Sequence, residues 1–265
     1  MKLFAFDVDG TLIDYNQNIL SSTIDSVNTI LEKGDYMVIA SGRPFPGVKK
    51  YLDYFKNGKK YAICSNGALV CDYLGNKLYE NGLTIADLKR IFNRYQEYIN
   101  EINIFCFIDG KIGYLKDDKW IHSEARLNDT VILNLLDSDF KDDKVIEKVI
   151  IAGEKEVVDK IIIYDDLKKD YFVVRSSIFF YDFMHTGIDK STGVNFLADY
   201  LGIKKSDVYT FGDAENDLLM ITNFNGVAMG NAVNSVKKVA KFITSDVKED
   251  GIKNAIEKIY NIKEN

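Results

Sequence analysis

Leu3-Phe4-Ala5-Phe6-Asp7-Val8-Asp9-Gly10-Thr11 is the stretch that decides the fold of this 265-residue chain. Its apolar half predicts a buried strand over residues 2–7, and the two carboxylates that follow are separated by a single residue. Residues i and i+2 of an extended segment share a face, and glycine lets the chain turn away at once. Because open α/β sheets bind ligands at the carboxyl ends of their strands, we expect Asp7 and Asp9 to point into one crevice.

Two carboxylates this close need a cation or a proton nearby. An EF-hand calcium loop is excluded, because the third acidic position and the closing Glu are missing and Asn18 stands twelfth from Asp7. A surface turn is the plainer alternative, since Asp and Gly are common turn residues, but the preceding strand disfavours it. With Mg²⁺, one carboxylate could act as a nucleophile while the other moves the proton of a leaving group. Phosphoryl groups suit this arrangement, because Mg²⁺ completes its coordination with water and substrate phosphate.

Composition narrows the class of protein. Apolar residues make up 46% of the chain, enough for a substantial core at this length. The net charge of -6 disfavours nucleic acid as a partner, because contact with its phosphates needs a basic face. The three cysteines lack metal-type spacing, and the N-terminus is neither a secretory signal nor a membrane span. We therefore expect a cytoplasmic protein without a nucleic-acid or membrane partner. Separately, we expect a monomer or weak homodimer.

Strand-like and helix-like segments alternate at both ends of the chain, as is typical of a parallel sheet covered by helices. Apolar residues at helical spacing from Leu20 to Leu31 predict a helix that stops at Gly34. Further strands are expected over residues 36–40, 61–64, 207–212 and 226–229. The predicted fold class is therefore α/β, with a Rossmann-like doubly wound parallel sheet as its core.

The pattern changes in the middle of the chain. A helix is expected to open at Thr84, and a hairpin over residues 102–115 is expected to turn at Asp109-Gly110. We interpret this region as a second, α+β domain inserted into the first. The predicted division is a first core segment at 1–82, an inserted domain at 83–184 and a second core segment at 185–265.

Ser41, Gly42 and Arg43 follow the second predicted strand. The hydroxyl and the closely approachable glycine amide could hold a phosphate oxygen, but an ordinary turn with Ser41 as a helix N-cap is an alternative. Arg43 could contact substrate or form a surface ion pair. The triplet Ser65-Asn66-Gly67, which ends the third strand, could line the same crevice.

Three further candidates lie late in the chain. Asp213 follows the strand at 207–212 and is well placed to bind the metal, although it could instead cap a helix. Asp217 stands four residues on, where it could orient a water or hold a lysine. Lys190 stands at the expected start of a helix, where the helix dipole disfavours a cation. Neutralising a nucleophile and phosphoryl oxygens would explain it, and a surface lysine is the alternative.

Taken in order, four segments resemble the four motifs of the haloacid dehalogenase (HAD) superfamily of phosphohydrolases. They are Asp7-Val8-Asp9-Gly10-Thr11, Ser41, Lys190 and Gly212-Asp213-Ala214-Glu215-Asn216-Asp217. The Ser41-Gly42-Arg43 triplet, the segment at 226–232 and the large insertion between the second and third motifs are similar to the Cof-type subfamily. The resemblance implies a HAD-like core with an α/β cap inserted into it.

The resemblance also implies roles for the site residues. Asp7 would be the nucleophile that forms an aspartyl-phosphate, and Asp9 would protonate the leaving alcohol and then activate water. Ser41 and Lys190 would bind phosphoryl oxygens, and Asn216 would contact the phosphate. Gly42 and Arg43 would belong to the same phosphate-binding segment as Ser41.

The implied metal is Mg²⁺, held by Asp7, the backbone carbonyl of Asp9 and Asp213, with Asp217 supporting the site. Two features depart from the family pattern. The segment at Lys190 reads Asp-Lys-Ser-Thr-Gly where relatives often have Lys-Gly directly, and the inserted domain has no motif that can be transferred.

The predicted function is a Mg²⁺-dependent phosphatase that acts on small phosphorylated metabolites, either sugar phosphates or phosphorylated cofactors. A phosphomutase is an alternative, since it would use Asp7 and Asp9 in the same way while excluding water from its intermediate. A non-catalytic module that signals through a phosphorylated Asp is a further alternative. Such a module needs neither Asp9 nor a large inserted domain.

Overall fold

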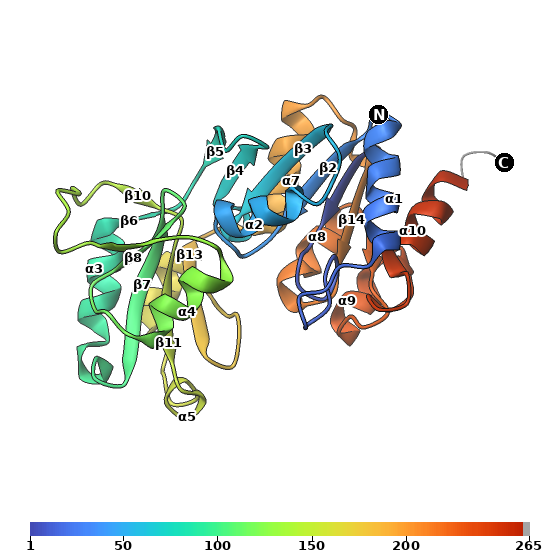
Figure 1. Ribbon diagram of the computed structural model, residues 1–265. Helices are drawn as coiled ribbons and strands as arrows, with labels where there is room; N and C mark the ends of the chain where they lie inside the picture. Colours follow the sequence, from blue (N-terminus) through green and yellow to red (C-terminus); the bar gives the residue numbers. More distant parts are fainter. Residues whose placement is uncertain (262–265) are drawn as a thin grey trace.

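The computed structural model describes residues 1–261 and contains two main sheets (Figure 1). The strands of the larger sheet are β1 (Leu3–Phe6), β2 (Tyr36–Ala40), β3 (Lys59–Cys64), β4 (Leu69–Asp72), β5 (Lys77–Glu80), β14 (Val208–Gly212), β15 (Asn225–Ala228) and β16 (Phe242–Ile243). Their order is β16-β15-β14-β1-β2-β3-β4-β5, and only β4 and β5 run antiparallel to their neighbours. The chain proceeds outward from β1 on one side and from β14 on the other, so the strand order reverses between these two strands.

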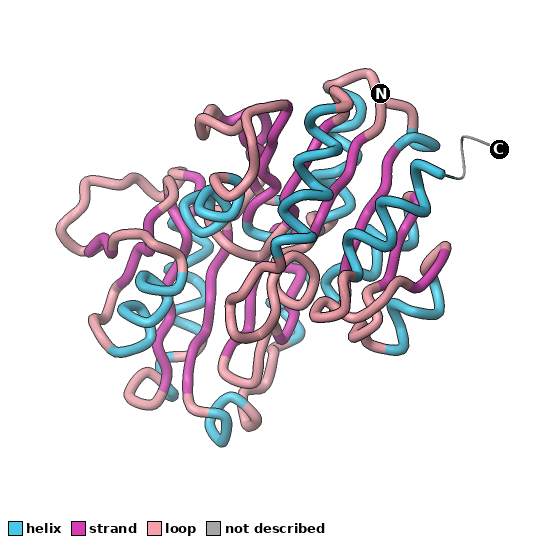
Figure 2. The backbone as a smooth tube through the Cα atoms, turned by 45° about the vertical axis from the view of Figure 1, so that its right-hand side comes forward, coloured by secondary structure: helices cyan, strands magenta, loops and turns pink. Residues whose placement is uncertain are grey.

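Helices cover both faces of the larger sheet, as Figure 2 shows. One face packs against α1 (Ser21–Glu32), α2 (Phe45–Leu52), α9 (Asn234–Val239) and α10 (Gly251–Asn261). The other face packs against α7 (Lys190–Tyr200) and α8 (Leu218–Asn223). Phe4 and Phe6 belong to the first core, Leu3 and Ala5 to the second. Burial on both sides explains why this strand is apolar throughout, and the expected doubly wound α/β core is confirmed.

The expected elements of the larger sheet are present with small shifts at their ends. The helix predicted after Leu20 is α1, and the chain leaves it through Gly34 at φ +78°. The predicted second strand coincides with β2, whereas β3 begins two residues before the predicted strand, at Lys59. After β14, residues Glu215–Asp217 form a 3₁₀ turn that continues as the helix Leu218–Asn223.

The smaller sheet has six strands, namely β7 (Ile102–Ile108), β8 (Lys111–Tyr114), β9 (Ile132–Asn134), β11 (Lys148–Gly153), β12 (Tyr171–Arg175) and β13 (Phe180–His185). They lie in the order β12-β13-β11-β7-β8-β9, and only the pair β8 and β9 is parallel. Helix α3 (Ile85–Arg94) packs on one face and α4 (Lys119–Leu127) on the other. This sheet and its helices form the second lobe, to the left in Figure 1.

Local sequence signals in this lobe are also confirmed. Thr84 caps α3 through a reciprocal pair of hydrogen bonds with Asp87. The hairpin of β7 and β8 turns at Asp109 and Gly110, both with positive φ, as the Asp-Gly pair predicts. The remaining short elements are β6 (Leu83–Thr84), β10 (Val145–Ile146), α5 (Lys155–Val158) and α6 (Asp165–Asp170). Within residues 1–261, no helix combines the length and hydrophobicity that crossing a membrane requires.

Candidate active site

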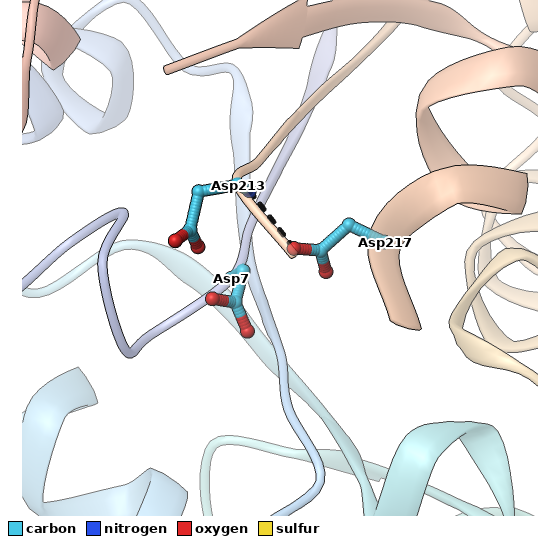
Figure 3. A group of neighbouring side chains, drawn as sticks. All are labelled: Asp7, Asp213 and Asp217. Carbon is cyan, nitrogen blue, oxygen red and sulfur yellow. Dashed lines mark hydrogen bonds between the residues drawn. The ribbon is translucent and has the colours of Figure 1, made fainter. Parts of the chain in front are cut away.

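Asp7 and Asp213 leave the larger sheet at the point where its strand order reverses. Phe6 of β1 is in register with Phe211 of β14, and the Asp7 amide donates to the Phe211 carbonyl at 3.0 Å. Connections that lead to opposite faces of the sheet leave a crevice between two such strands, at their carboxyl ends. Figure 3 shows the carboxylates of Asp7, Asp213 and Asp217 gathered there.

Lys190 is buried between two of these carboxylates. Its side chain is 0% exposed, and its Nζ lies 2.6 Å from Asp7 Oδ1 and 2.7 Å from Asp217 Oδ1. Burial by itself would lower the pKa of Lys190, but the charges of Asp217 and Asp7 raise it. Lys190 is therefore not a surface residue. Its two carboxylate partners explain why a cation stands at the start of α7, where the helix dipole disfavours one.

Both carboxylate oxygens of Asp217 accept hydrogen bonds from groups that form the site. Its Oδ1 accepts from Lys190, and its Oδ2 accepts from the backbone amides of Asp213 and Ala214 at 3.0 and 3.1 Å. Both carboxylate oxygens thus have donors within the protein. The side chain fixes the turn after β14 and places Asp213 opposite Asp7.

Asp213 receives donors from two loops. Its carboxylate accepts from Thr11 Oγ1 at 3.3 Å, Tyr15 Oη at 3.0 Å and Asn231 Nδ2 at 3.4 Å. Gly10 permits this approach, because a Cβ at that position would lie 2.3 Å from Asp213 Oδ2, and its φ of +85° also favours glycine. Ala214, not Asp213, is the N-cap of the following 3₁₀ turn, so the capping alternative does not apply.

The three buried carboxylates suit a hard divalent cation. One oxygen from each of Asp7, Asp213 and Asp217 lies within 4.8 Å of the others. Burial and the charge of Asp217 raise the pKa of Asp7 well above its usual value, and the same two causes raise that of Asp213 to about 6. A cation would relieve this repulsion, and carboxylate oxygens are ligands that Mg²⁺ prefers. Asp7 and Asp213 face the open space beside the cluster, whereas Asp217 is fully buried and does not reach that space, so Asp7 and Asp213 are the residues available to a metal.

Asp9 lies beside this cluster and pairs with Arg43. The guanidinium donates from Nη2 to Asp9 Oδ1 at 2.7 Å and from Nε to Oδ2 at 3.0 Å. Burial would raise the pKa of Asp9, but the hydrogen bonds and charge of Arg43 lower it. Arg43 Nη1 also donates to the Leu127 carbonyl at the end of α4, at 3.2 Å. The arginine therefore connects the carboxylate to the lobe of the smaller sheet.

The polar residues that follow β2 and β3 meet beside the carboxylates. Ser41 is not a helix N-cap, since Pro44 occupies the N-cap position of α2, and the Ser41 Oγ accepts from the Arg43 amide at 3.3 Å. Asn66, in the left-handed conformation at φ +57°, accepts from Asn216 Nδ2 at 3.4 Å.

A cavity of about 440 Å³ opens onto these groups. Its walls include most of the predicted site residues, namely Asp7, Asp9, Ser41, Gly42, Arg43, Asp213 and Asn216. Lys190 is not among the described residues that line it, because this side chain lies behind Asp7. Asp217 is fully buried as well. The structure thus brings all nine predicted residues to one place, seven of them on the cavity wall.

Known proteins resemble this chain over nearly all of its length. A family model of haloacid dehalogenase-like hydrolases matches residues 4–256. The chain belongs to this family. The resemblance inferred from the four motifs is therefore confirmed, and the protein is a HAD-like hydrolase.

Individual relatives agree with this assignment. The hydrolase is 30% identical to a Bacillus subtilis protein named "Putative phosphatase YxeH" over 97% of this chain and 98% of that protein. It is 25% identical to the Bacillus subtilis "5-amino-6-(5-phospho-D-ribitylamino)uracil phosphatase YitU" over 98% of each. The crystal structure of a haloacid dehalogenase-like hydrolase from Bacteroides thetaiotaomicron superposes with a TM-score of 0.86, at 29% identity, over 97% of this chain and 99% of that one.

Two neighbours of the carboxylates in this HAD-like hydrolase were not predicted from sequence. Tyr15 stands in a loop with no distinguishing pattern, so nothing local indicates its bond to Asp213. Asn231 lies in the segment at 226–232 that resembles the Cof-type subfamily. That segment follows β15, which lies beside β14 in the sheet. Its emergence at the same edge as Asp213 could have indicated that Asn231 lies near this carboxylate.

Proposed function

We propose that this hydrolase is a Mg²⁺-dependent phosphatase that acts on small phosphorylated metabolites through an aspartyl-phosphate at Asp7. The observation that supports this most directly is the buried Lys190, which holds Asp7 and Asp217 at 2.6 and 2.7 Å beside Asp213. A carboxylate fixed by a buried ammonium is preorganised as a nucleophile toward an anionic phosphoryl group. The names of YxeH and YitU are consistent with a phosphatase.

In the first step, an oxygen of the Asp7 carboxylate attacks phosphorus. A bond forms between that oxygen and phosphorus, the bond from phosphorus to the ester oxygen breaks, and Asp9 gives its proton to the departing alkoxide. In the second step, Asp9 takes a proton from water as the water oxygen bonds to phosphorus. As this bond forms, the bond from Asp7 to phosphorus breaks, which releases inorganic phosphate, restores the Asp7 carboxylate and leaves Asp9 protonated for the next turnover.

Asp7, Asp213 and the backbone carbonyl of Asp9 would hold Mg²⁺, with Asp217 positioning Asp213. When bound, the ion would offset the negative charge of the phosphoryl oxygens and of the carboxylates around it. Lys190 contributes the protein's own positive charge behind Asp7. Ser41 and Asn216 line the cavity beside Asp7, where their polar groups can contact phosphoryl oxygens.

Arg43 has a second partner available in this mechanism. In the structure it holds Asp9 ionised, whereas the first step needs Asp9 protonated. An entering phosphoryl group would compete for the guanidinium, because planar bidentate pairing suits phosphate as well as carboxylate. Loss of the Arg43 contact would let the pKa of Asp9 rise, so substrate entry would itself favour the acid form.

We further propose that residues 83–184 form a cap over the cavity, because α4 reaches Arg43 and Lys50 through the Leu127 carbonyl. The substrates would be sugar phosphates or phosphorylated cofactors. We expect the enzyme to work in the cytoplasm as a monomer or weak homodimer, without nucleic-acid or membrane partners.

The test is phosphate release from a panel of phosphorylated metabolites, with Mg²⁺ and with EDTA. We expect turnover only with the metal and none in Asp7→Asn. Borohydride reduction of acid-quenched enzyme should convert the phosphorylated Asp7 to homoserine, which peptide mass spectrometry detects. Turnover in Asp7→Asn, or reduction at another residue, would contradict the mechanism. Transfer of phosphate within a sugar, stimulated by a bisphosphate and faster than release, would identify a phosphomutase instead.

A further inference from the structure

One face of the smaller sheet carries charged residues among apolar ones. Phe107 and Ile150 belong to the apolar cluster that α4 covers. Lys148 shares their face, since it stands two residues before Ile150 on β11 and opposite Phe107 on β7. Asp182 of β13 stands opposite Ile150, also on this face. Because this face of the sheet is covered by α4, the usual alternation of side chains along a strand would place apolar residues at positions 148 and 182.

Lys148 and Asp182 form a buried ion pair. Lys148 Nζ lies 2.6 Å from Asp182 Oδ2, and the side chains are only 6% and 2% exposed. Ser176 donates from Oγ to Asp182 Oδ1 at 2.8 Å. Removing two charges from water costs several kcal/mol per ion, and an apolar pair of similar volume often stabilises a protein as well or better. Stability therefore does not explain why charges stand here.

The pair lies on the wall of the proposed active-site cavity. Lys148, Asp182 and Ser176 line the same space of about 440 Å³ as Asp7 and Asp9. A group bonded to a phosphate at Asp7 would extend into this space. The charged pair is thus placed where the leaving alcohol, and not the phosphoryl group, would lie.

We propose that Lys148, Asp182 and Ser176 recognise hydroxyl groups of the leaving alcohol, an inference that rests on the phosphatase function proposed above. An ammonium has three donors, a carboxylate only accepts, and a serine hydroxyl does both. Adjacent hydroxyl groups of a polyol each donate and accept, so one can accept from Lys148 while its neighbour donates to Asp182. An alkyl chain would cover these buried charges without bonding to them.

The subsite formed by Lys148, Asp182 and Ser176 is also selective for the charge of the alcohol that it binds. Glu124 of α4 lines the cavity together with Asp182, so two carboxylates face one ammonium on this lobe. A second phosphate on the substrate would meet net negative charge there. Phe107 and Phe180 supply apolar surface beside the polar groups. The subsite therefore fits an uncharged, hydroxyl-bearing alcohol better than an alkyl group or a bisphosphate.

The experiment compares two substrates of equal length, erythritol 4-phosphate and butyl phosphate, with Mg²⁺ present. The variant is Lys148→Met/Asp182→Leu, which replaces both charges together and so leaves neither buried without its partner. In the wild type, we expect kcat/KM to favour the polyol ester. In the variant, kcat/KM for erythritol 4-phosphate should fall about 10²-fold while that for butyl phosphate stays within about threefold. Ser176→Ala, a milder change, should reduce the same preference by less.

The control is Lys155→Met, which removes a lysine from an exposed ion pair with Asp159 in the same lobe and should leave both rates unchanged. Equal losses for the two esters in the double variant would indicate a purely structural pair and overturn the proposal. A wild-type enzyme that does not distinguish the esters would also overturn it, while leaving the phosphatase function standing. Failure to hydrolyse either ester or 4-nitrophenyl phosphate would refute the phosphatase function itself.

Discussion

Replacing Lys190 by Met should destabilise the protein strongly and in a pH-dependent way. The side chain is fully buried, and it is the ammonium partner of both Asp7 and Asp217. Removing one partner of a buried ion pair typically costs about 3–5 kcal/mol, because the remaining charge is left in a poor solvent. In a chain of this size each kcal/mol lowers the melting temperature by about 2–4 °C, so we expect a decrease of about 6–20 °C at pH 7.

The pH dependence follows from the pKa of Asp7, which burial and Asp217 already raise in the wild type. Without Lys190 it should rise further. A carboxyl group whose folded pKa lies above its unfolded value favours folding below the unfolded value and loses that contribution as pH rises. The cost of Lys190→Met should therefore be small near pH 4 and increase toward pH 7, with a slope of up to about 1.4 kcal/mol per pH unit.

The assay is urea unfolding at several pH values with EDTA present, so that no metal replaces the lost charge. Lys60→Met is the matched control, because Lys60 is also buried but donates to the backbone carbonyls of Leu52 and Phe55. Burial lowers the pKa of Lys60, but an amine that keeps its proton in both the folded and the unfolded chain over this pH range adds no pH dependence, so the cost of losing it should depend little on pH. A cost below about 1 kcal/mol for Lys190→Met, or one that does not vary with pH, would refute the reasoning.

Three other changes test separate parts of the site. Asp9→Asn should abolish turnover with natural esters while the melting temperature stays within a few degrees, because Asp9 is half-exposed; turnover at the wild-type rate would remove its acid–base role. Asp213→Asn should raise the Mg²⁺ concentration needed for half-maximal activity, by about tenfold or more, and an unchanged metal titration would count against its role as a ligand. Glu147→Gln should stabilise the protein increasingly as pH rises above about 4.5, since burial raises the pKa of Glu147 and ionisation of that group opposes folding; a difference in melting temperature that is constant with pH would argue against this.

The part of the site built on parallel strands could be predicted from sequence. An apolar strand that ends in Asp7 and another that ends before Asp213 must both release these residues at the carboxyl edge of one sheet. Gly10 marked the turn, and the structure adds that it also makes room for the Asp213 carboxylate. The information was local, because strand direction and strand ends fix where these side chains emerge.

The subsite in the smaller lobe could not be predicted in this way. Lys148 and Asp182 are 34 positions apart, and each stands in a short strand whose other residues are mostly apolar. Which residues of antiparallel strands β11 and β13 face each other depends on their register, which the intervening α5, α6 and β12 set through tertiary packing. The sequence between the strands contains no tight two-residue turn that would have fixed that register in advance.

Lys190 and Arg43 show that the role of a basic residue near a site cannot be inferred from sequence until the burial of its side chain is known. From sequence, each could have been a surface residue after a helix start or a strand end. In the structure, Lys190 is 0% exposed and shared between two buried carboxylates, so releasing it would leave both unpaired. Arg43 instead lines the cavity and pairs with the Asp9 side chain, which is 45% exposed, so water or phosphate can replace either partner at lower cost. In the proposed mechanism, the lysine would therefore be a permanent part of the surroundings of Asp7, and the arginine would be the cation that changes partners when substrate enters.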